Sequence, residues 1–192
     1  VAFMRSGDIK TVLLALATTI GGGALILKIK PYIAKRFNTW GHAIEYASDG
    51  GFQQAHVLTY LASGGLFGVG IGNGFLKYVF ASESDLVFGI VCEELGIIVG
   101  FVLIIAILCL AIYTRDIATR SRSTFYSISA CCAAGLFIVQ MSLNVFGATD
   151  ILPLTGVTFP FVSAGGSSMI SCWGLLAFIK AADERTYSQK RG

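Results

Sequence analysis

Residues 152–168 read Leu-Pro-Leu-Thr-Gly-Val-Thr-Phe-Pro-Phe-Val-Ser-Ala-Gly-Gly-Ser-Ser. This stretch belongs to an uncharged run, residues 151–179, that is long enough to span a bilayer. The first half of this run is rich in proline, glycine and serine, which interrupt or cap helices. Irregular backbone at membrane depth must be satisfied by protein or by a wet cavity. The stretch therefore predicts a site at the membrane surface as well as an anchor.

The composition of the chain indicates a membrane protein. Of its 192 residues, 55% are hydrophobic and 13% are charged, whereas a soluble domain carries about 25% charged residues. The net charge is +3, and no basic patch interleaved with aromatic residues points to nucleic acid, which we exclude as a partner. The five cysteines lie in apolar segments without a CxxC pair, so we interpret them as small buried residues.

Apolar runs bounded by charged residues predict an all-α polytopic membrane helix bundle with about four transmembrane helices. The expected spans lie near residues 9–29, 87–113, 123–147 and 160–182. Residues 30–86 form a large predicted loop with short helices. An alternative is that residues 51–75 also cross or dip into the membrane, but their many glycines and polar residues favour a loop. Because the chain opens on Val1, we expect it to be part of a longer polytopic protein.

The basic residues of the connections predict the orientation. The loop over residues 114–122 carries three arginines and the tail carries three basic residues, whereas the connection around Asp150 has none. Basic residues favour the cytoplasmic side, so this loop and both termini are expected in the cytoplasm. The 30–86 loop and a re-entrant-like segment, residues 148–168, are then extracytoplasmic. The basic residues between 28 and 36 oppose this orientation, but the length of their loop weakens the rule.

Asp85 is the first candidate for chemistry. It follows a polar turn and precedes the apolar residues 86–88, where a helix is expected to begin. Spacing alone favours a helix N-cap, because an aspartate satisfies free backbone N–H groups there. A capping carboxylate at a membrane surface can also act as a base, so both roles stay open.

Glu93 and Glu94 follow on the same predicted helix, about 12–13 Å beyond Asp85. A carboxylate inside a bilayer is by default a candidate for function. However, residues 95–113 can span a membrane unaided, which would leave both glutamates at the interface. Both interpretations stand for Glu93, and the interfacial one is favoured for Glu94.

Two polar residues of the third predicted span, Gln140 and Asn144, lie four residues apart and hence on one helix face. Interhelical hydrogen bonding is the favoured role for this pair. The Gly-rich run over residues 63–74 lacks the strand–helix context of a nucleotide-binding loop, so close backbone packing is the preferred interpretation.

The run at residues 163–168, Ser-Ala-Gly-Gly-Ser-Ser, combines glycines that expose backbone N–H groups with serines that can cap a helix. A helix that starts at Ser167 would present its positive end to an anion such as pyrophosphate. It would be too short to span before Lys180, so it must begin nearer Pro160 or continue past that lysine. Taken by itself, the run favours a plain Pro/Gly turn.

Three stretches together resemble the SEDS family, the FtsW/RodA/SpoVE group of bacterial membrane proteins. They are residues 62–73, residues 84–96, and residues 144–168 with the quoted stretch. The resemblance implies the C-terminal part of a ten-helix bundle. It also implies a peptidoglycan glycosyltransferase that polymerises lipid II with a class B penicillin-binding protein as partner. The family's essential acidic residue falls on Asp85, and Lys77 matches a lysine that follows a Gly-x-Gly-Asn element ending at Asn73. Ala164 departs from the family, where Tyr or Asn is common.

The resulting hypothesis is inverting glycosyl transfer at the outer face of the bacterial cytoplasmic membrane, with Asp85 as general base. A divalent cation (Mg²⁺ or Mn²⁺) and substrate-binding residues would hold the lipid pyrophosphate. The expected substrate-binding residues are Asn73, Lys77, Glu93, Ser163, Gly165, Gly166, Ser167 and Ser168. The alternatives are a lipid II flippase and a non-catalytic scaffold that docks a penicillin-binding protein among the membrane lipids.

Overall fold

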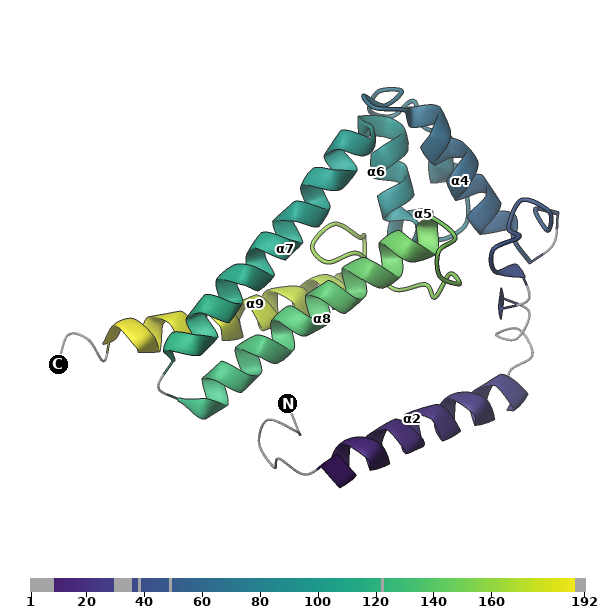
Figure 1. Cartoon of the computed structure of the whole chain (residues 1–192). Coiled ribbons are helices and arrows are strands. Elements are labelled where there is room, and N and C mark those ends of the chain that lie inside the picture. The colour runs from purple at the N-terminus through teal and green to yellow at the C-terminus, as the bar shows by residue number, and fades with distance from the viewer. Residues whose placement is uncertain (1–8, 30–35, 38, 49, 122, 189–192) are drawn as a thin grey trace.

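A computed structural model describes residues 9–29, 36–37, 39–48, 50–121 and 123–188 (Figure 1). Every regular element in these ranges is helical, which confirms the all-α prediction. The α-helices are α2 (Ile9–Ile29), α4 (Phe52–Gly64), α5 (Ser82–Asp85), α6 (Val87–Leu95), α7 (Ile97–Arg120), α8 (Thr124–Ala148) and α9 (Gly166–Ser188). A short 3₁₀ helix, η1 (Leu76–Tyr78), lies between α4 and α5.

Two helices of the described chain, α7 and α8, are long and apolar enough to cross a membrane. Their 24 and 25 residues correspond to about 36 Å of helix. A shorter apolar stretch, Val12–Leu25, lies within α2. The last helix begins at Gly166, later than the predicted residue 160, and continues past Lys180. Crossing by α2 and α9 stays a prediction.

The predicted continuous span over residues 87–113 is wrong, because the chain breaks at Gly96 into α6 and α7. Gly96 has a φ of +88°, and a Cβ there would lie 2.2 Å from the carbonyl oxygen of Leu66. Only glycine tolerates both the backbone conformation and this approach. A Cβ at Gly100 would lie 2.6 Å from the Cys92 Sγ, so α6 folds back tightly against α7.

Short helices occupy the large predicted loop, as expected. The 13 residues of α4 extend about 20 Å, too little to cross a bilayer. This helix packs on α6 through glycines: a Cβ at Gly64 would lie 2.3 Å from the Cys92 carbonyl oxygen. A Cβ at Gly89 would lie 2.8 Å from side-chain atoms of Val57 and Leu76. The close contact fixes the position of α6 and hence of the turn that precedes it.

The irregular segment over residues 149–165 packs into the helical core instead of extending away from it. Phe159 is 1% exposed and stacks on Phe88 of α6, with ring centroids 6.4 Å apart. Phe161 contacts both Phe137 of α8 and Trp173 of α9. These aromatic contacts anchor the segment among α6, α8 and α9, as its position in Figure 1 also shows.

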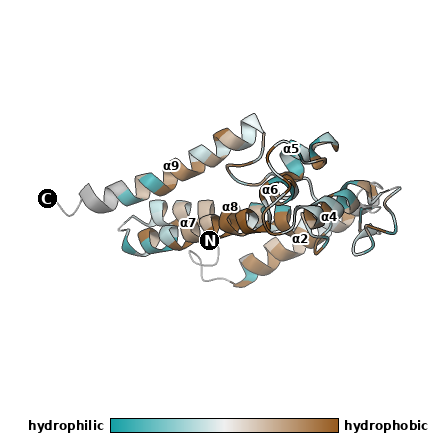
Figure 2. Ribbon diagram, turned by 90° about the horizontal axis from the view of Figure 1, so that it is seen from above, coloured by the Kyte–Doolittle hydropathy of each residue, from teal (hydrophilic) through white to brown (hydrophobic). Residues whose placement is uncertain are grey.

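The arrangement separates two ends of the molecule (Figure 1). The α7–α8 turn and the C-terminal end of α9 lie at one end, and α4, α5 and α6 lie at the other. Residues 114–120, predicted as loop, are instead the last turns of α7. The predicted placement of this turn and the tail on one side agrees with the grouping, and the membrane side itself stays a prediction. Hydrophobic residues colour α2 and the central part of the α7–α8 pair, whereas α5 is hydrophilic (Figure 2).

Candidate functional site

Asp85 is the last residue of the one-turn helix α5, and the N-cap position of α6 belongs to Leu86. The expectation that Asp85 caps the following helix is therefore wrong, since no side-chain cap bond is made there. Its carboxylate is partly buried and makes no hydrogen bond or ion pair with any residue that the structure describes. A partly buried charge without a partner costs free energy in a folded protein. Such a group is available for a substrate.

The final carbonyl groups of α5 are held from outside the helix. The pairs are Ala164 N–H to Glu83 O (2.9 Å), Ser163 Oγ to Ser84 O (2.6 Å) and Asn144 Nδ2 to Asp85 O (2.9 Å). Helix-terminal carbonyls have no intrahelical partner, so these donors take the place of the missing turn. They fix the backbone that carries the carboxylate of Asp85.

Asn144 and Ser163 each link α5 to the irregular segment by a second hydrogen bond. Asn144 Nδ2 also donates to the Val157 carbonyl at 2.7 Å, and Ser163 Oγ accepts the Phe159 N–H at 2.8 Å. Their side chains are only 1% and 2% exposed. The structural role predicted for Asn144 is thus supported, with backbone carbonyls of the site as its partners.

A glycine brings the irregular segment against the carboxylate. Gly156 has a φ of +69°, and a Cβ at this position would lie 3.0 Å from Asp85 Oδ2. The carboxylate therefore rests beside bare backbone. Any side chain at position 156 would enter the space beside the acid.

A cavity of about 360 Å³ opens beside α5 and brings Lys77 and Ala164 together with residues 81–84. The ammonium group of Lys77 donates to the Gly72 carbonyl and lies 5.3 Å from the ring centroid of Tyr78. Asn73 is exposed and donates from Nδ2 to the Val69 carbonyl at 3.3 Å. The structure therefore brings Lys77 to α5, whereas Asn73 stays on the surface of the glycine-rich loop.

Glu93 is 1% exposed and holds the start of η1. Its two carboxylate oxygens accept the backbone N–H groups of Phe75 (2.7 Å) and Leu76 (3.0 Å). Both oxygens are occupied, so the contacts assign Glu93 to holding the backbone beside Lys77. The predicted contact of Glu93 with substrate finds no support in these contacts.

Glu94 binds the glycine-rich loop, where its Oε2 accepts the Gly72 N–H at 3.0 Å. A Cβ at Gly68 would lie 2.2 Å from the Glu94 carbonyl oxygen. The interpretation of the glycine-rich run as a close backbone contact is confirmed.

The start of α9 joins the irregular segment through side chains. Thr158 Oγ1 and Ser168 Oγ lie 2.7 Å apart and share a hydrogen bond. The first-turn N–H groups of α9 belong to Gly166, Ser167 and Ser168 and have no partner within the helix. Gly165 precedes them and contacts Ser168, since a Cβ there would lie 3.4 Å from the Ser168 Cβ.

The second member of the predicted polar pair, Gln140, is less well accounted for. Its Oε1 is buried and accepts no hydrogen bond from the residues that the structure describes, and the same holds for Asn144 Oδ1. The interhelical bonding expected of Gln140 therefore stays a prediction.

A second set of contacts, which the sequence does not indicate, joins residues 36 and 40–43 to residues 150–154. We call these contacts the loop clamp. Its hydrogen bonds are Arg36 Nη1 to Leu154 O (2.6 Å), Trp40 Nε1 to Ile151 O (3.0 Å), Gly41 N to Asp150 Oδ1 (3.2 Å) and Ala43 N to Asp150 Oδ2 (3.4 Å). These partners are more than 100 residues apart in sequence. No periodicity or local motif relates them, so only the folded chain shows the contact.

Comparison with known proteins identifies the family of this chain. The family model described as "Cell cycle protein", for FtsW, RodA and SpoVE, matches residues 1–188. The chain therefore belongs to this family, and the predicted class, an all-α polytopic membrane helix bundle, is confirmed.

The relatives carry glycosyltransferase names. The chain is 37% identical over 191 residues to the probable peptidoglycan glycosyltransferase FtsW of Lactococcus lactis, covering 94% of this chain and 46% of the relative. It is 32% identical over 146 residues to the protein of the same name from Bacillus subtilis, covering 75% and 36%. The peptidoglycan glycosyltransferase RodA of Mycobacterium leprae is 27% identical over 179 residues, covering 93% and 38%. The chain thus spans less than half the length of these curated relatives.

Proposed function

We propose that this chain forms part of a peptidoglycan glycosyltransferase that polymerises lipid II at the outer face of the bacterial cytoplasmic membrane. The observation that carries the proposal is the carboxylate of Asp85, which is partly buried, unpaired within the described chain and carried by a fixed backbone. The names of the relatives support the reaction class.

In the proposed reaction, Asp85 accepts the proton of a sugar hydroxyl on the acceptor. The hydroxyl oxygen forms a bond to the anomeric carbon of the donor sugar, while the bond from that carbon to the lipid pyrophosphate breaks. The bonding electrons leave with the pyrophosphate, and the configuration at the anomeric carbon inverts. General-base assistance of this kind contributes about 10²- to 10⁴-fold to a rate.

The charge that develops on the pyrophosphate needs cations or hydrogen-bond donors nearby. Lys77 beside α5 and the first-turn N–H groups of Ser167 and Ser168 are the candidates for this role. The described residues contain no cluster of three or more His, Cys, Asp or Glu side chains. Mg²⁺ is often held by one or two carboxylates together with substrate phosphates, so a divalent cation, Mg²⁺ or Mn²⁺, would bind only with the substrate. Glu83, which lines the same cavity as Lys77, is the carboxylate proposed to help hold this cation.

The setting of this reaction is also part of the proposal. A class B penicillin-binding protein is the proposed partner, and membrane lipids surround the helices. Both ends of this chain are placed in the cytoplasm. The clustering of the α7–α8 turn with the end of α9, opposite α5, supports such an orientation (Figure 1).

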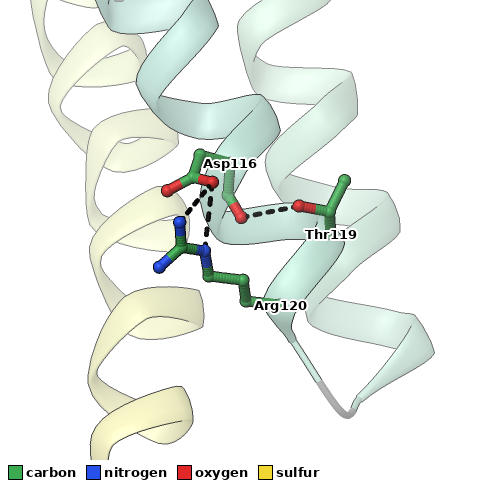
Figure 3. A network of polar contacts seen from close by, with 3 residues as sticks. All are labelled: Asp116, Thr119 and Arg120. Carbon is green, nitrogen blue, oxygen red and sulfur yellow. Dashed lines mark hydrogen bonds and ion pairs between the residues drawn. The ribbon is translucent and has the colours of Figure 1, made fainter.

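Polymer formation from lipid II by the purified full-length protein in detergent tests the proposal. Detergent removes membrane sidedness, so a flippase yields no polymer, whereas a glycosyltransferase does. Asp85→Asn should abolish the polymer. Asp116→Asn is the matched control, because Asp116 pairs with the exposed Arg120 at the far end of α7, with Arg120 Nη2 2.9 Å from its Oδ1 (Figure 3). Polymer formation by the Asp85→Asn protein would refute the role of Asp85 as the base, whereas an unaltered protein that forms no polymer would favour the flippase or the scaffold alternative.

A further inference from the structure

The loop clamp places a cation next to the proposed active site. Arg36 is partly buried, and its Nη1 donates a hydrogen bond of 2.6 Å to the Leu154 carbonyl. No carboxylate among the described residues forms an ion pair with it. Arginine side chains removed from water are normally paired with an anion. Arg36 makes no such pair with the residues that the structure describes, so its guanidinium group can bind an external anion.

The chemistry of the guanidinium group defines that anion. It carries five N–H donors in a planar fork, and the carbonyl of Leu154 takes one of them. The remaining donors match two oxygen atoms of a phosphate or pyrophosphate in a bidentate geometry. The carbonyl contact holds the side chain in place before the ligand arrives, which lowers the entropy lost on binding.

Arg36 and Asp85 lie beside the same part of the irregular segment. Arg36 contacts Leu154, and two residues further along the loop Gly156 lies against the Asp85 carboxylate. The α-carbons of residues two apart are separated by at most about 7 Å. The cation and the proposed base therefore contact the same short piece of backbone.

We propose that Arg36 binds the pyrophosphate of the lipid-linked substrate, as a cation additional to Lys77. The inference rests on the proposed function, because it assigns the leaving group of that reaction to a named side chain. Arg36 binds the leaving pyrophosphate, while Asp85 faces the acceptor hydroxyl. The other clamp hydrogen bonds, made by Trp40 and Asp150, hold residues 40–43 against the loop.

The test measures binding of undecaprenyl pyrophosphate to the full-length protein in detergent, which requires no turnover. Arg36→Gln should raise the dissociation constant about tenfold or more, because a charge-assisted bidentate contact is lost. Arg36→Lys should raise it less, since lysine keeps the charge but loses the fork. Undecaprenyl monophosphate should bind more weakly than the pyrophosphate and lose less affinity in Arg36→Gln. Inorganic pyrophosphate should compete weakly, which separates a lipid-linked ligand from a free one.

Trp40→Phe is the matched control, because it removes a neighbouring clamp hydrogen bond without removing a charge. It should leave the dissociation constant within about threefold of the original value. Equal weakening by Trp40→Phe and Arg36→Gln would overturn the proposal, since loss of the clamp would then explain both. Unchanged binding in Arg36→Gln would overturn it as well. Arg36-dependent binding in a protein that forms no polymer would instead refute the proposed function alone.

Discussion

Replacing Gly156 with alanine tests the contact between the irregular segment and Asp85. The residue has a φ of +69°, a conformation that costs a residue with a Cβ roughly 1–2 kcal/mol. The new Cβ would lie 3.0 Å from Asp85 Oδ2, so the carboxylate must move by a few tenths of an ångström. A misplacement of about 1 Å at a reacting group can cost about 100-fold in rate. We therefore expect Gly156→Ala to lower polymerisation roughly tenfold and the free energy of unfolding by about 1 kcal/mol.

The assay compares initial rates of lipid II polymerisation with thermal unfolding of the same purified full-length protein. Gly135→Ala provides the control, because this glycine lies within α8 and a Cβ there meets nothing within 4 Å. Its unfolding temperature should stay the same or rise, since alanine favours a helix over glycine. An active Gly156→Ala protein with unchanged stability would refute the reasoning that Asp85 is confined by this loop.

Two further substitutions test how the site is held. Glu93→Gln replaces one acceptor oxygen by a donor that faces the backbone N–H groups at the start of η1. Thermal unfolding should show a free energy of unfolding lower by about 1–3 kcal/mol, and unchanged stability would contradict the assigned contacts. Asn144→Leu leaves the carbonyls of Asp85 and Val157 without their shared donor. It should lower stability by a similar amount, about 1–3 kcal/mol, and reduce kcat more than KM. A change confined to KM would instead place Asn144 at the substrate.

Apolar runs bounded by charged residues predict those helices whose ends are determined by the local sequence. The predicted spans 9–29 and 123–147 agree closely with α2 (Ile9–Ile29) and α8 (Thr124–Ala148). The last span was placed six residues too early, because the start of α9 depends on hydrogen bonds between residues 159–164 and α5. The break at Gly96 was missed because the approach of Leu66 that requires it is a tertiary contact.

The candidate site was predicted only in part. Asp85 was selected by family resemblance, whereas local spacing suggested an N-cap that the structure assigns to Leu86. The burial of Glu93 against η1 depends on the path of the glycine-rich loop, which composition does not specify. In the sequence, Arg36 is only one of the basic residues between 28 and 36 that oppose the predicted orientation. Its contact with Leu154 joins parts of the chain 118 residues apart.

The transfer rate of the full-length Asp85→Asn protein at saturating lipid II tests the proposed role of Asp85 most directly. Asparagine keeps the size of the side chain and the backbone contacts of α5, but it cannot accept the proton. We expect a rate at least about 100-fold below that of the unaltered protein, with undecaprenyl pyrophosphate still bound. A rate within a few-fold of the unaltered protein would contradict the assignment of Asp85 as the general base.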